Sequence, residues 1–217
     1  MRSNALEAYK KTLQLSQEQR EVLIGLMLGD GHLESQNEGR TYRLKIVQSS
    51  AHRAYIDHLY QLFADWVRTP PQAKIVHSRG HTSENWWFNT LSHPSLRFYA
   101  QQFYGRKEKV VPRLIHRWLT PRALAYWFMD DGSVKSSQSK GVLFNTQGFT
   151  QAGVRRLCMV LEKNFGLQVN PRKQKSGQQI YVSGTSYEVF RGWVEPYMLP
   201  EMMYKIPPAR QTSLPKE

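Results

Sequence analysis

The sequence predicts an α+β fold built from two similar halves. Each half begins with an apolar helix that ends in Asp-Gly, and the two copies lie about half the chain apart. After each helix, strand-like and helix-like segments follow, which predicts the order αββαββα twice. A repeat of this length indicates two related domains rather than a solenoid, because solenoid repeats are shorter.

The two apolar helices have clear start signals. Ser16 and Gln19 form a capping-box pattern before an apolar run that ends at Gly29-Asp30-Gly31. Thr120 followed by Pro121 predicts an N-cap and a first helical residue. The apolar run after them ends at 130–132, Asp-Asp-Gly. Each run is about three turns long, so both halves are expected to open on a buried helix.

A strand is expected after each of these helices. In 40–48 the apolar residues Tyr42, Leu44 and Ile46 alternate with Thr41, Arg43 and Lys45, which predicts a half-buried strand with a basic outer face. The counterpart in the second half is 140–147. Both segments end in glutamine.

The remaining elements also occur in matched pairs. Helical stretches are expected at 51–67 and 150–165, hairpins at 73–89 and 167–182, and closing helices at 95–104 and 187–195. Each half then shows a lysine shortly before a proline: Lys109 before Pro112, and Lys205 before Pro207. We therefore expect an N-terminal half at 1–111 and a C-terminal half at 112–217, with 69–71 as a loop inside the first half.

Composition narrows the choice of partner. The 217 residues carry 30 Lys+Arg against 17 Asp+Glu, a formal net charge of +13. This excess favours an anionic partner, with nucleic acid first and an acidic membrane surface second. No apolar stretch is long enough to span a membrane, and no basic amphipathic helix supports binding at its surface. Cys158 is the only cysteine, which excludes an intrachain disulfide and fits a reducing compartment.

These motifs together resemble those of the LAGLIDADG homing endonucleases in their single-chain form with two motifs. The nine-residue motif corresponds to 23–31 and again to 124–132, and the resemblance extends over about 16–207. The second copy with its downstream segments is similar to the intron-encoded organellar subgroup. In that copy Tyr126 and Trp127 replace small or aliphatic residues, which is expected to change how closely the two helices approach.

The resemblance implies a fold and a reaction. The motif helices would pack at the centre of two pseudo-symmetric halves, and the antiparallel sheets would form a DNA-binding saddle. The reaction would be metal-dependent hydrolysis of both strands of a long DNA site, leaving 3′ overhangs. Asp30 and Asp131 would hold Mg²⁺ (or Mn²⁺), because two carboxylates held close repel unless a cation lies between them. The backbone carbonyls of Gly29 and Asp130 would assist.

Four further residues are candidates for the reaction. By resemblance, Lys109 and Lys205 are the basic residues near each scissile phosphate, where an ammonium can neutralise charge. Gln48 and Gln147 are candidates for orienting ordered water around the metals, with a strand-end polar role or a base contact as alternatives.

Basic and amide side chains on the strands and their loops are the candidates for DNA contact, since Arg and Lys read guanine and Asn or Gln read adenine. They are Arg40, Arg43, Lys45, His77, Arg79, Lys135, Lys140, Asn145, Arg172, Lys173 and Lys175. For each single residue, a phosphate contact or a solvated side chain is favoured over base readout. The tryptophans are expected to be mainly core residues.

The leading hypothesis is a monomeric, site-specific endodeoxyribonuclease acting on double-stranded DNA. The alternative is an intron RNA maturase, or a DNA-binding protein that does not cleave, on the same scaffold, with intron RNA as a further partner. An intracellular location is expected, in an organelle (mitochondrion or chloroplast) or the cytoplasm.

Overall fold

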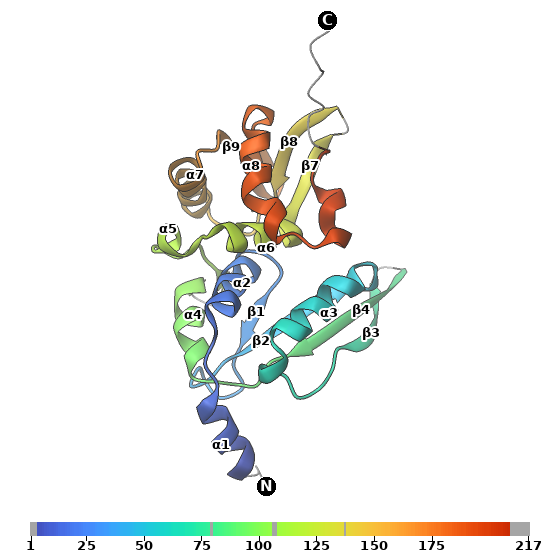
Figure 1. Ribbon diagram of the computed structural model, residues 1–217, viewed down its shortest axis with the longest axis vertical. Helices are drawn as coiled ribbons and strands as arrows, with labels where there is room; N and C mark the ends of the chain where they lie inside the picture. Colours follow the sequence, from blue (N-terminus) through green and yellow to red (C-terminus); the bar gives the residue numbers. More distant parts are fainter. Residues whose placement is uncertain (1–3, 79, 106–107, 137, 209–217) are drawn as a thin grey trace, which may run out of the picture. The chain divides into compact units, whose positions relative to one another are not determined.

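The computed structural model describes residues 4–78, 80–105, 108–136 and 138–208. It divides into two compact units, residues 1–112 and 113–217. Each unit combines helices with a four-stranded antiparallel sheet (Figure 1), which confirms the α+β class. Within the described residues, no helix is long and apolar enough to cross a membrane.

The first unit contains a sheet of strand order β1-β2-β4-β3 and a small hairpin, β5-β6. Its helices are α1 (Asn4–Thr12), α2 (Gln17–Leu28), α3 (Arg53–Leu62) and α4 (Ser95–Phe103), with short 3-10 turns at Ser50–His52 and Ala64–Trp66. Its strands are β1 (His32–Glu34), β2 (Arg43–Ser49), β3 (Gln72–Ser78), β4 (His81–Asn89), β5 (Tyr104–Gly105) and β6 (Glu108–Lys109).

The second unit repeats this topology with the strand order β7-β8-β10-β9. Its helices are α5 (Ile115–Trp118), α6 (Pro121–Asp131), α7 (Gln151–Phe165) and α8 (Tyr187–Val194), and its 3-10 segments are η3 (Gly184–Ser186), η4 (Glu195–Tyr197) and η5 (Pro200–Lys205). Its strands are β7 (Gly132–Ser136), β8 (Ser139–Phe144), β9 (Val169–Gln174) and β10 (Gly177–Val182). The shared strand order shows that the sequence repeat is a structural repeat.

Both motif helices begin as their sequences predict. The Ser16 hydroxyl accepts from the Gln19 backbone N–H, and the Gln19 side chain accepts from the Ser16 N–H, so the capping box is complete. The Thr120 side chain accepts from the Ala123 N–H, with Pro121 in the first turn. These bonds satisfy N–H groups that a helix start leaves without intrahelical partners.

The glycine after each motif aspartate is required by packing rather than by a left-handed backbone. A Cβ on Gly31 would lie 2.8 Å from Leu26 Cβ, and one on Gly132 would lie 2.1 Å from a Phe128 ring carbon. Neither glycine has a positive φ. The chain therefore returns so closely over the helix end that only glycine fits.

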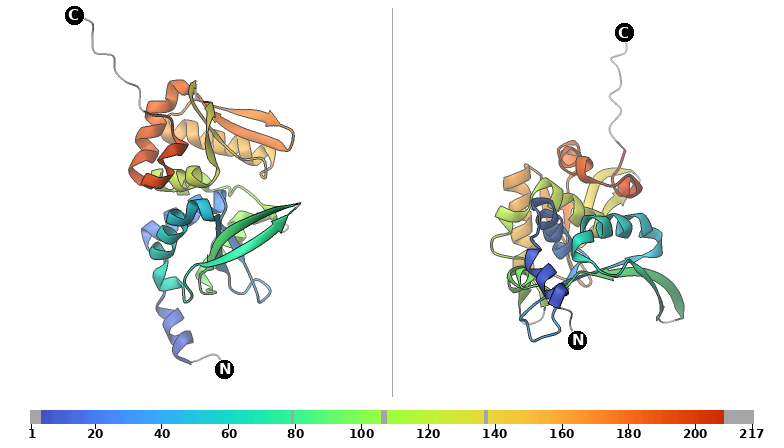
Figure 2. Two further views of the ribbon diagram at one scale, coloured as in Figure 1. Left: turned by 90° about the vertical axis from the view of Figure 1, so that its right-hand side faces the viewer. Right: turned by 60° about the horizontal axis from the view of Figure 1, so that its bottom comes forward.

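Helix α3 packs on the inner face of the first sheet, and α7, together with α8 against β8, packs on that of the second (Figure 2). The inner faces carry the buried strand residues Leu44, Ile46, Phe88, Val142, Phe144, Ile180 and Val182. The predicted alternation in 40–48 is thus confirmed, with apolar residues inward and Arg43 and Lys45 outward. The predicted order αββαββα has a strand in the places that β1 and β7 occupy, but these strands are short and the sequence carries no clear signal for their bounds.

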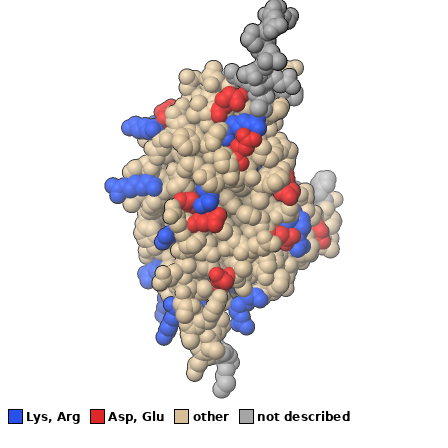
Figure 3. Space-filling model, in the orientation of Figure 1, with Lys and Arg blue, Asp and Glu red and all other residues tan. Residues whose placement is uncertain are grey.

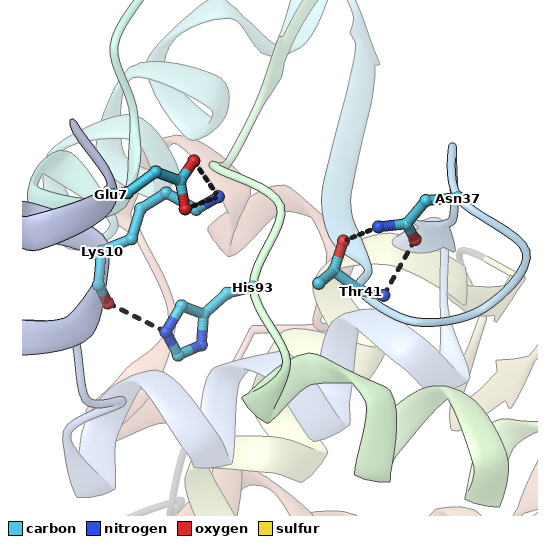
Figure 4. A network of polar contacts seen from close by, with 5 residues as sticks. All are labelled: Glu7, Lys10, Asn37, Thr41 and His93. Atoms are coloured by element: carbon cyan, nitrogen blue, oxygen red, sulfur yellow. Dashed lines mark hydrogen bonds and ion pairs between the residues drawn. The ribbon is translucent and has the colours of Figure 1, made fainter. Parts of the chain in front are cut away.

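Helix α1 is tied to the first unit by polar contacts (Figure 4). His93 Nε2 donates to the Lys10 carbonyl at 2.9 Å, and its Nδ1 accepts from the Ser95 backbone N–H. Tyr9 adds a hydrogen bond from its hydroxyl to the Asp65 carbonyl. In the loop before β2, Asn37 and Thr41 pair through two 2.9 Å hydrogen bonds that order the entry to this strand.

Candidate active site

The first half brings an aspartate, a glutamine and a histidine together at the end of α2. Gln48 Nε2 donates to Asp30 Oδ2 at 3.2 Å. The side-chain oxygen Oε1 of Gln48 faces His52 Nδ1 at 3.4 Å. Asp30 is exposed, whereas Gln48 is only 7% exposed. The buried amide therefore holds a carboxylate that solvent and ligands can reach.

Lys109 approaches the same helix end from the β5-β6 hairpin. Its Nζ donates to the Gly29 carbonyl at 2.5 Å. The hairpin is fixed by Tyr104, whose hydroxyl accepts from the Leu33 N–H at 3.0 Å and lies 2.9 Å from His32 Nδ1. Burial, followed by the charge of Lys109, lowers the pKa of His32. These contacts bring Lys109, near the end of this half, to the C-terminal end of the motif helix α2.

The second half repeats the lysine contact on a different local scaffold. Lys205, at the end of η5, donates from Nζ to the carbonyl of Asp130 at 3.0 Å and also to that of Met129. Met202 and Ile206 on either side of it are buried and anchor the segment. Both predicted lysines therefore lie at the C-terminal ends of their motif helices.

The two glutamines differ in their placement. Gln48 is a buried residue of β2. Beyond the end of β8, the buried residue is Thr146, which is 1% exposed and donates from its hydroxyl to the Gln178 carbonyl. Gln147 is one position further and is half-buried. Thr146 lies two residues past the end of β8, and its burial matches that of Gln48 in the first half. The water-orienting role of Gln147 stays a prediction.

The oxygens at the helix ends are a donor set of the kind that hard divalent cations prefer. Asp30 and Asp131 supply carboxylates, and the carbonyls of Gly29 and Asp130 already accept from ammonium groups. Among the described residues, no cluster of three or more His, Cys, Asp or Glu side chains could hold a metal. A cation here would therefore depend on backbone oxygens, water and substrate phosphate, as Mg²⁺ commonly does.

The outer face of the first sheet forms a basic groove of about 280 Å³. It is lined by Arg43, Lys45, Val47, Lys74, Val76, Asn85, Trp87 and Asn89. Arg43 pairs with Glu34 at 2.5 Å, and Lys45 lies 4.0 Å from the same carboxylate. Trp86, on the opposite face of β4, lies 3.5 Å beneath the Arg53 guanidinium. Trp87 was expected in the core, yet alternation along β4 puts it on the groove side.

The outer face of the second sheet carries an ordered chain of amides. Gln174 Nε2 donates to Gln179 Oε1 at 2.9 Å, and Gln179 Nε2 donates to Asn145 Oδ1 at 2.6 Å. Beside them Tyr181 lies within 5.1 Å of Lys135 Nζ and 5.8 Å of the Arg172 guanidinium carbon. Amide and cationic side chains lie near one another on this face, which suits contact with base edges and phosphates.

The other predicted DNA-contacting residues lie elsewhere. By alternation, His77, Lys140 and Lys173 lie on the faces opposite to these outer surfaces. Lys140 donates to the Pro208 carbonyl. Arg40 and Lys175 are exposed in loops, and Arg79 is outside the described residues. Lys and Arg side chains also occur beside acidic ones on the face shown in Figure 3, so basic charge is not confined to the sheets.

Comparison with known proteins defines the class that this fold and site represent. The model of the LAGLIDADG DNA endonuclease family matches residues 20–190. The chain is 31% identical to DNA endonuclease I-ChuI of Chlamydomonas applanata, over 89% of this chain and 96% of that protein. This protein belongs to the LAGLIDADG DNA endonuclease family.

Solved structures agree with this assignment. The homing endonuclease I-WcaI, bound to its DNA recognition sequence, matches with a TM-score of 0.89 and 31% identity over 94% of this chain and 92% of that one. A more distant relative is the cytochrome b mRNA maturase bI2 of Saccharomyces cerevisiae, at 28% identity over 85% of this chain and 46% of that protein. The family resemblance read from the two motifs is thus confirmed.

Proposed function

We propose that this protein is a site-specific homing endonuclease that hydrolyses both strands of a long DNA target with a divalent metal. The observation that carries the proposal is the recurrence of one arrangement in both halves. In each, an aspartate at the end of the motif helix lies beside a carbonyl that accepts from a lysine. Family membership and the likeness to a DNA-bound homing endonuclease support it.

The side chains of the chain divide the work of the reaction. Asp30 and Asp131 would hold the cation, which when bound supplies Lewis acidity and activates water. Gln48 holds Asp30 in place through its amide. Lys109 and Lys205 would neutralise charge on the phosphate oxygens. The sheet groove and the amide chain would set the register of the duplex and read base edges.

A divalent metal, preferably Mg²⁺, is part of the proposal because of the oxygen-rich donor set. Action as a monomer follows from the presence of both motifs in one chain, and pseudo-symmetric halves suit an asymmetric target. Their packing around a shared centre, the separation of the halves near residue 111, and an organellar or cytoplasmic location stay predictions.

The test is cleavage of a plasmid that carries the intronless form of the protein's own insertion site. Wild type should cut with Mg²⁺ and not with EDTA. Asp30→Asn and Asp131→Asn should each lower the cleavage rate by about 10³ or more, since metal-bound charge stabilisation is worth several kcal/mol. A wild type that binds this site tightly but never cuts it would refute the nuclease proposal. Specific binding and splicing of intron RNA without DNA cleavage would instead favour the maturase alternative.

A further inference from the structure

Each half places a lysine ammonium on a backbone oxygen at the end of its motif helix. Lys109 reaches the Gly29 carbonyl at 2.5 Å, and Lys205 reaches that of Asp130 at 3.0 Å and that of Met129. One lysine lies on a strand of a hairpin and the other at the end of a 3-10 segment. Because the contact recurs on unlike scaffolds, it is a property of the site rather than of one loop.

The helix end explains why a cation rests there. The last carbonyls of a helix have no intrahelical partner, and the helix dipole makes this end negative. Asp30 and Asp131 add a carboxylate to each end. An ammonium that donates to the carbonyl satisfies the oxygen and offsets part of the negative charge. When no other cation is bound, the lysine ammonium therefore supplies the positive charge at each helix end.

We propose that Lys109 and Lys205 compete with the divalent cation for these carbonyl oxygens, so that cation binding displaces each ammonium. The inference rests on the proposed function, in which a divalent cation binds at these helix ends. Mg²⁺ binds oxygen at about 2.1 Å. On an oxygen that also accepts from an ammonium at 2.5 Å, the two cations would be only about 4 Å apart and would repel strongly. The lysine stem can move, whereas the backbone oxygen is fixed by its helix.

Displacement would couple metal binding to the placement of charge on the substrate. The released ammonium keeps its flexible four-carbon stem and its three donors, which suit a phosphate oxygen. Without metal, the lysine instead caps the helix end. The same residue would thus stabilise the metal-free site and contact the phosphate only after the cation has bound.

The experiment measures Mn²⁺ affinity without DNA, by the electron paramagnetic resonance signal of free Mn²⁺. Lys109→Met and Lys205→Met remove the ammonium and keep most of the stem. Each should bind Mn²⁺ at least about fivefold more tightly than wild type, the lower end of typical coupling between sites. The matched control is Lys163→Met on α7, which loses the same charge from an exposed position and should bind Mn²⁺ as wild type does.

Two further variants make the result decisive. Lys109→Arg and Lys205→Arg keep a cation at the carbonyl and should bind Mn²⁺ close to wild-type strength, and thermal melts monitored by circular dichroism show which variants are folded. Equal or weaker Mn²⁺ binding by the two Met variants, or no binding by either, would overturn the proposal. Tighter binding by both in a protein that never cuts its target would leave this inference standing while the nuclease proposal fails.

Discussion

The amide of Gln48 donates a 3.2 Å hydrogen bond to a carboxylate oxygen of Asp30, and it does so from a buried position on β2. For this bond to form, the side-chain oxygen Oε1 of Gln48 must point the other way, toward His52 Nδ1. An imidazole that carries a proton on Nδ1 fits this arrangement, because the amide oxygen can only accept. His52 is therefore a positioning residue for Gln48, which in turn positions the aspartate.

Under the proposed function, in which Asp30 binds the cation, Gln48→Ala should lower the cleavage rate about 10- to 100-fold, as losing a partner of a metal ligand commonly does. Binding of target DNA without metal should be nearly unchanged, since Gln48 is not on the groove face. Single-turnover cleavage and fluorescence anisotropy separate the two effects. His52→Ala should cause a smaller loss of the same kind. A large loss of DNA affinity in Gln48→Ala would show that the residue contacts DNA instead.

Gly31→Ala and Gly132→Ala should destabilise the protein by about 1–3 kcal/mol, the usual cost of overpacking. Gly132→Ala should cost more, because its new Cβ would lie 2.1 Å from the Phe128 ring. Chemical denaturation measures the free energy of unfolding. Gly192→Ala in α8 is the matched control. A Cβ there meets nothing within 4 Å, so alanine should stabilise its helix by up to about 1 kcal/mol.

Glu34→Gln should tighten binding to DNA and steepen its salt dependence. The Glu34 carboxylate pairs with Arg43 and lies near Lys45 in the basic groove, so neutralising it makes more positive charge available to phosphates. The slope of log K against log salt should become more negative by about 1 for each added phosphate contact. Glu162→Gln, on α7, changes the net charge equally and should leave the slope unchanged. A slope equal to wild type in both variants would place the duplex away from this groove.

Cys158 should resist modification in the folded protein. Burial raises the pKa of its thiol to about 11, so the reactive thiolate is scarce at pH 8. A disulfide reagent such as DTNB should react rapidly only after denaturation. Between about pH 9 and pH 11 the unfolded chain releases this proton while the folded chain keeps it, so the free energy of unfolding should fall as pH rises through that window. Rapid labelling of native protein at pH 8 would contradict this.

Much of the fold follows from local sequence signals. The capping box at Ser16 and the Thr120-Pro121 start both form as their patterns predict, because caps depend only on residues within one turn. The alternation of apolar and polar residues in 40–48 likewise located β2 and its basic face, because it depends only on residues close in sequence. Strands β1 and β7 are short and carry no alternation of their own, so their pairing with β2 and β8 was not visible.

The site itself was only partly predictable. The motif aspartates, Gln48 and the two lysines could be named from spacing and family resemblance. Sequence spacing did not indicate His52, because its contact depends on where the turn after β2 directs the ring. It also matched Gln147 with Gln48, whereas the buried residue just past the end of β8 is Thr146; the role of Gln147 stays a prediction. A shift of one residue reverses the face of a strand, and spacing counted in sequence does not detect it.

Sequence patterns alone identify the family, the repeat of one topology and the residues able to carry nuclease chemistry. Those features depend on the types and order of residues. The tertiary structure decided which groups meet: Lys109 on the Gly29 carbonyl, Lys205 on that of Asp130, and Gln48 on Asp30. Such contacts join residues far apart in the chain, so they depend on strand register and on the close return of the backbone over Gly31 and Gly132.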